Sequence, residues 1–97
     1  MNDYIVELTI VDTCCTKCFR DSSEKTISIS DNSQVINLKN GYTLTVVSVS
    51  PTYCTVLIQN GVFAIVRNIF TTYDTQICLP AKCVEHVLTL SCRIIRV

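Results

Sequence analysis

The chain has 97 residues, of which 48% are apolar, so it has room for one domain and too much apolar character for a disordered segment. Eight basic residues balance eight acidic ones, which gives no electrostatic reason to bind nucleic acid or an anionic membrane and leaves little repulsion between copies. The commonest apolar residues are Val and Ile, accompanied by many Thr and Ser, a composition typical of strands rather than helices.

Alternation of apolar and polar residues, the period of a strand, marks most of the chain. Residues 4–12 form a first extended run, and residues 13–23 are polar and indicate a loop. Residues 1–23 are therefore predicted to be an N-terminal arm that carries a cysteine cluster, and 24–97 a β-sandwich domain. The eight strand-like runs of that domain are 24–30, 34–39, 42–50, 53–60, 62–70, 75–79, 83–90 and 93–97.

Two Asn-Gly pairs, Asn40-Gly41 and Asn60-Gly61, predict tight turns between antiparallel neighbours. Eight short strands joined by such turns are typical of a two-sheet sandwich. The predicted fold class is all-β: an eight-stranded β-sandwich with an N-terminal extended arm. The strand count favours a jelly roll over an immunoglobulin-like arrangement, although the sequence does not give the strand order.

The one histidine, His86, shares a predicted strand face with Val84, Leu88 and Leu90. It has two interpretations, a base for a cysteine nucleophile or a packed residue, and the apolar face favours the second. The carboxylates show no paired spacing, and two glycines are too few for a phosphate-binding loop. We therefore expect no enzyme, no catalytic residue, no cofactor and no metal ligand.

Seven cysteines cannot all pair within one chain, so at least one is expected to be free, metal-bound or bonded to another molecule. Cys14-Cys15-x-x-Cys18 is the densest group. Half a zinc site would need a second ligand pair, and Cys78-x4-Cys83 is looser than usual. A redox pair would need a following helix, which the sequence does not predict.

Two other interpretations of the thiols are inert burial and cross-linking. Burial suits Cys54 and Cys78, because both lie on apolar runs. Cross-linking suits an extended arm, and adjacent cysteines rarely bridge each other. The candidates for intermolecular disulfides are Cys14, Cys15, Cys18, Cys54 and Cys92, with Cys54 and Cys92 as the first partners for the arm. Cys78 and Cys83 flank a short turn and are candidates for an intramolecular disulfide.

The residues Val11-Asp12-Thr13-Cys14-Cys15, before a predicted jelly roll, resemble the subunits of bacterial endospore appendages, or spore pili. The resemblance implies stacking into helical fibres by β-augmentation, with disulfides from the arm of one subunit to its neighbours. It also implies synthesis without a secretion signal and a later encounter with oxidant. The family has a third cysteine about a dozen residues after the pair, where this chain has Thr26.

The N-terminal residues include no basic segment, and the apolar run 4–11 is short and interrupted by Glu7, so neither a signal peptide nor a transmembrane helix is expected. The predicted function is a self-assembling structural subunit of a disulfide-cross-linked extracellular or spore-surface fibre, with copies of itself as partners. The alternative is a small cytoplasmic binding module, from a phage or an accessory system, with a zinc or thiol cluster.

Overall fold

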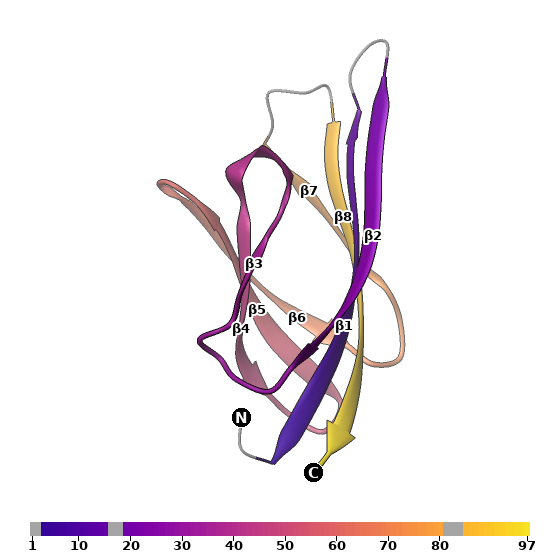
Figure 1. The fold of residues 1–97 in the computed structure, drawn as a ribbon, viewed down its shortest axis with the longest axis vertical. Coiled ribbons are helices and arrows are strands. Elements are labelled where there is room, and N and C mark those ends of the chain that lie inside the picture. Colours follow the sequence, from indigo (N-terminus) through magenta and orange to yellow (C-terminus); the bar gives the residue numbers. More distant parts are fainter. Residues whose placement is uncertain (1–2, 16–18, 81–84) are drawn as a thin grey trace.

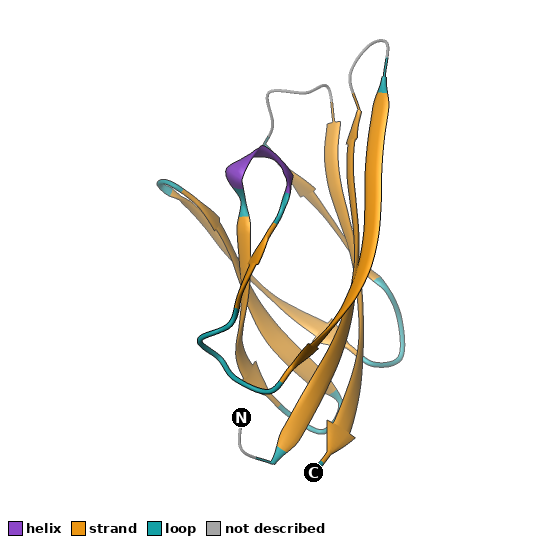
Figure 2. Ribbon diagram, in the orientation of Figure 1, coloured by secondary structure: helices purple, strands orange, loops and turns teal. Residues whose placement is uncertain are grey.

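The computed structural model describes residues 3–15, 19–80 and 85–97, and these fold almost entirely as strands (Figures 1 and 2). The prediction of an all-β chain with eight strands is confirmed. The elements are β1 (Tyr4–Cys15), β2 (Arg20–Ile29), β3 (Val35–Asn37), the 3-10 turn η1 (Lys39–Gly41), β4 (Thr43–Val49), β5 (Tyr53–Asn60), β6 (Phe63–Phe70), β7 (Thr75–Leu79) and β8 (Glu85–Arg96).

The strands form two four-stranded sheets that pack face to face. Sheet A has the order β2-β1-β8-β7 and sheet B has the order β3-β4-β5-β6, with antiparallel pairing throughout. Sheet B is a simple meander, in which consecutive strands are neighbours. Neither sheet of the described chain has the 4-1-2-3 strand order of a Greek key. A jelly roll consists of two Greek keys, so the sandwich is confirmed and the jelly-roll order is not.

The predicted N-terminal arm is part of the sandwich. Residues 4–15 form β1, which lies between β2 and β8 in the middle of sheet A. Its residues Val6, Leu8 and Ile10 are fully buried. The division into an arm at 1–23 and a domain at 24–97 is therefore corrected: removing the first strand would open sheet A and expose the core.

The predicted loop at 13–23 is also corrected, because β1 continues to Cys15 and β2 begins at Arg20. Ten consecutive residue pairs join β1 to β2, from Val6 with Ile29 to Cys15 with Arg20. Polar residues are tolerated here because β2 is an edge strand whose side chains lie mostly in solvent. The two predicted runs 83–90 and 93–97 are one continuous strand, β8, from Glu85 to Arg96.

The core fills the space between the sheets, and strand alternation decides which residues enter it. In β4, Leu44 and Val46 point inward. A bulge between Val46 and Ser48 then shifts the register, so that Val49 also packs against the core. The fully buried aliphatic side chains are Val6, Leu8, Ile10, Ile29, Leu44, Val46, Val56, Ile58, Ile69, Leu88 and Leu90.

Candidate functional site

A buried polar pair, Asp12 and His86, interrupts the apolar core at one end of the sandwich. Asp12 continues the inward side of β1 after Ile10, and His86 continues the inward side of β8 after Leu88. Asp12 is 2% exposed and His86 is 1% exposed. His86 Nε2 lies 2.6 Å from Asp12 Oδ1. The interpretation of His86 as a packed residue agrees with this burial, but its acidic partner was not predicted.

The remaining polar atoms of the pair are also bonded. The Lys39 backbone N–H donates to Asp12 Oδ2 at 2.7 Å, and Asn40 Nδ2 lies 3.4 Å from His86 Nδ1. An amide nitrogen only donates, so Nδ1 is the acceptor and the ring proton lies on Nε2, where it is donated to Asp12. The η1 turn therefore supplies two of the groups that satisfy a pair located on sheet A.

Asn40 is held where it can make this contact by its backbone conformation. Its φ of 62° and ψ of 26° are left-handed, a region that Asn tolerates better than most residues. Asn60 Nδ2 donates to the Asn40 carbonyl at 3.0 Å, and Asn40 Nδ2 lies 3.5 Å from Cys14 Sγ. The two predicted Asn-Gly turns therefore meet at this end of the molecule and bind each other.

Tyr42, between η1 and β4, covers the pair. Its ring packs edge-on against His86, with 5.5 Å between ring centroids, and against Phe63, at 5.9 Å. Its hydroxyl donates to the carbonyl of Pro80, just beyond β7. These contacts join the two sheets at their ends and keep water away from the Asp12–His86 bond.

The residues Cys14, His86 and Asp12 are the types that make a nucleophile, a base and an orienting acid. Cys14 is also the register partner of His86. The arrangement differs from a catalytic one, because His86 contacts Asp12 through one ring nitrogen and Asn40 through the other. Cys14 is moreover half of a disulfide and does not titrate. The geometry thus suits a structural network rather than proton transfer from a thiol.

The cysteines occupy three different environments. Cys54 and Cys92 are buried free thiols, Cys15 is a half-buried free thiol and Cys78 is an exposed one. Burial of Cys54 is as predicted, whereas Cys78 was expected to be buried and is not. No two of the described cysteines are joined to each other. Cys18 and Cys83 lie outside the described residues. Because Cys78 is free, the predicted intramolecular bridge from Cys78 is not formed in this structure.

The predicted role of Cys54 and Cys92 as partners for another chain is corrected by their position. Cys54 is fully buried and Cys92 is 8% exposed, so neither sulfur is within reach of a neighbouring molecule while the sandwich stays closed. The physical reason is strand alternation: Cys54 shares its side of β5 with Val56 and Ile58, and Cys92 shares its side of β8 with Leu90.

Cys15 and Cys78 lie on the outer face of sheet A. Both belong to the outward-facing side of their strands, because the buried residues of β7 are Ile77 and Leu79. A hollow of about 340 Å³ crosses this face beside Cys15. Its lining residues come from four neighbouring strands and are Val11, Thr13, Cys15, Arg20, Gln76, Glu85, Val87 and Thr89.

Within the described ranges, no group of three His, Cys, Asp or Glu side chains is placed to hold a metal ion. Those ranges also contain no helix long and apolar enough to cross a membrane. In comparisons with known proteins, no family model, no curated protein and no solved structure matches this chain. The resemblance to spore appendage subunits stays a prediction from sequence.

Proposed function

We propose that the chain is a structural subunit that assembles with copies of itself and is cross-linked by disulfides between chains. The observation that carries the proposal is the pair of free thiols, Cys15 and Cys78, on one outer face. The extracellular or spore-surface setting rests on the sequence resemblance alone, and the balanced charge of the chain favours close approach of copies.

Cys15 and Cys78 are too far apart to bond to each other. β8 separates β1 from β7, so the two strands are about 10 Å apart. Cys15 lies opposite Glu85 and Cys78 opposite Val87, an additional offset of two residues. Their Cα atoms are therefore about 12 Å apart, whereas a disulfide requires Cα atoms within about 7 Å. Each thiol thus remains available to a different molecule.

The two thiols also lie at different borders of sheet A. Cys15 is the last residue of β1, at the end of the sheet, and Cys78 is on the edge strand β7. A subunit with two separate bonding positions forms a chain, whereas a subunit with one stops at a dimer. The number of bonding thiols therefore distinguishes a polymer subunit from a protein that only dimerises on oxidation.

A second surface favours self-association without covalent bonds. The edge strand β6 of sheet B has eight residues, and its outer backbone groups have no neighbouring strand in the described chain. Val66 on this strand is 55% exposed, and Val62 in the preceding turn is fully exposed. An open edge with apolar side chains is a template for adding a strand from another copy.

The test is to oxidise the purified chain and separate the products on a non-reducing gel. We expect the parent to form a ladder beyond the dimer, Cys15→Ser and Cys78→Ser to stop at the dimer, and the double variant to stay monomeric. Thr13→Ser, on the same face, is a matched control that should keep the ladder. A parent that runs only as a monomer, or a ladder that persists in the double variant, would contradict the proposal.

A further inference from the structure

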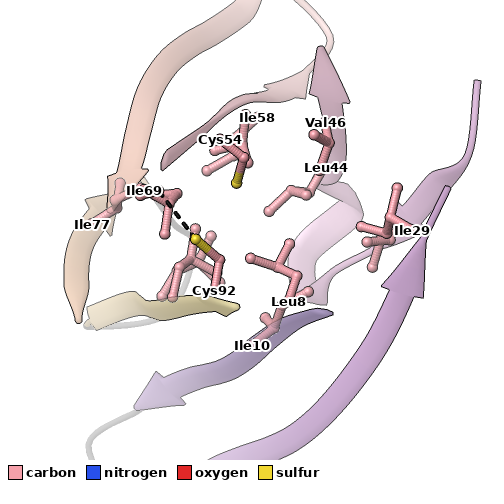
Figure 3. Packing of buried hydrophobic residues seen from close by; sticks show 14 of the residues in the cluster. Leu8, Ile10, Ile29, Leu44, Val46, Cys54, Ile58, Ile69, Ile77 and Cys92 are labelled. Atoms are coloured by element: carbon pink, nitrogen blue, oxygen red, sulfur yellow. Dashed lines mark hydrogen bonds between the residues drawn. The ribbon is translucent and has the colours of Figure 1, made fainter. Parts of the chain in front are cut away.

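Two buried thiols face each other across the core. Cys54 enters it from β5 in sheet B and Cys92 from β8 in sheet A. Figure 3 shows both sulfur atoms directed into the space between the sheets. The surrounding side chains are aliphatic, and they include Leu8, Ile58 and Ile69.

The contacts of Cys92 bring it to the backbone beside Cys54. Cys92 Sγ donates to the Ile69 carbonyl at 3.2 Å, and Ile69 is the register partner of Cys54 on the neighbouring strand. Each thiol also shifts the pKa of the other, as expected of two neighbouring thiols. Both are free in this structure, so an oxidisable pair is preassembled inside the sandwich.

We propose that Cys54 and Cys92 are an oxidation site, where a small-molecule disulfide such as glutathione disulfide produces an intramolecular bond between the two sheets. The bond would close a loop across the sandwich that includes β6 and β7 and most of β5 and β8. Sandwich domains of antibodies have a comparable inter-sheet disulfide. This inference is independent of the surface thiols that carry the proposed function.

The reaction is a pair of thiol–disulfide exchanges. The Cys92 thiolate attacks one sulfur of glutathione disulfide, the S–S bond breaks, and one glutathione leaves as a thiol. The Cys54 sulfur then attacks the Cys92 sulfur of the mixed disulfide and releases the second glutathione. Two protons and two electrons pass from the cysteines to glutathione disulfide, which is reduced to two thiols.

The environments of the two sulfurs set this order. The hydrogen bond from Cys54 lowers the pKa of Cys92, although burial opposes the effect. The hydrogen bond to Cys92 and burial together raise the pKa of Cys54. Cys92 also keeps 8% of its surface exposed while Cys54 keeps none. Cys92 is therefore the first nucleophile and Cys54 the resolving one.

The experiment uses the full chain with Cys15→Ser and Cys78→Ser, so that surface cross-links do not interfere. This protein is incubated with glutathione disulfide just below its unfolding temperature, where local opening admits the oxidant. Its remaining thiols are then alkylated under denaturing conditions. Digestion by trypsin together with a glutamyl endopeptidase isolates Cys54 in residues 40–67 and Cys92 in residues 86–93, each peptide with no other cysteine.

We expect these two peptides to be recovered as one disulfide-linked species that reductant separates. We also expect the oxidised protein to melt roughly 10–20 °C higher than the reduced one, because the bond closes a long loop. Cys92→Val in the same background should abolish the disulfide-linked peptides. It should also abolish the increase in melting temperature that this disulfide causes. Recovery of both peptides as alkylated thiols, or linked to other cysteines, would overturn the proposal whatever the surface thiols do.

Discussion

Replacing Asp12 by Asn tests whether the buried Asp12–His86 pair stabilises the fold. The carboxylate accepts two hydrogen bonds, from His86 at 2.6 Å and from the Lys39 backbone N–H at 2.7 Å. An amide has one acceptor oxygen, so Asp12→Asn keeps one bond and turns an N–H group toward the other donor. The lost bond to a charged group and the donor left unsatisfied each cost about 1–3 kcal/mol. We expect a total loss of about 2–6 kcal/mol, a large part of the roughly 5–15 kcal/mol that stabilises a domain.

The assay is guanidinium denaturation followed by far-ultraviolet circular dichroism, because the chain has no Trp to report on unfolding. Asp21→Asn is the matched control. Its carboxylate also binds Lys39, through Nζ at 2.8 Å, but Asp21 is 54% exposed. Exposed ion pairs contribute about 0–1 kcal/mol, so this variant should lose little. An equal decrease in the free energy of unfolding in the two variants would refute the argument that burial makes the hydrogen bonds of Asp12 stabilising.

Three other substitutions test separate parts of the fold. Tyr42→Phe removes the hydroxyl that donates to the Pro80 carbonyl and should lower stability in thermal unfolding by about 1 kcal/mol, whereas Tyr73→Phe, on a ring that is 57% exposed, should not. Gly61→Ala should lower the free energy of unfolding by about 1 kcal/mol in the same assay. The φ of 57° at this position strains a residue with a Cβ, even though no atom lies within 4 Å of where the Cβ would be. Gly61→Asn should lower it less, because Asn tolerates a positive φ better. Val66→Lys places a charge on the open edge of β6 and should reduce light scattering by the chain under reducing conditions, and unchanged scattering would argue against that edge as a contact.

Strand alternation and turn chemistry predicted the parts of the fold that depend on local sequence. The face of β8 that carries His86, Leu88 and Leu90 was grouped correctly because buried residues recur there at every second position. The Asn-Gly turns were recognised because both need residues that accept a positive φ, and Asn40, Gly41 and Gly61 have one. Local signals of this kind determine elements, and they give no information about which strands become neighbours.

The predicted strand boundaries were wrong where the sequence does not show an alternation of apolar and polar residues. Residues 20–23 of β2 are polar and exposed, so they were assigned to the predicted loop, even though they pair with the end of β1. In β8, one predicted run ended at residue 90 and the next began at residue 93, which divided one continuous strand into two. The Asp12–His86 bond joins residues 74 positions apart, and it follows only from the register between β1 and β8.

The same alternation explains how one chain separates two kinds of thiol. Cys54 and Cys92 follow the inward side of their strands, while Cys15 and Cys78 follow the outward side of theirs. An oxidant would therefore have two separable consequences in this protein: a bond in the core stabilises a single copy, and bonds at the surface join copies. Thermal stability reports the first effect and gel ladders report the second. Substitutions at Cys54 and Cys92 should change thermal stability and leave the gel ladder unchanged. Substitutions at Cys15 and Cys78 should have the opposite effect, because the two pairs lie on opposite sides of sheet A.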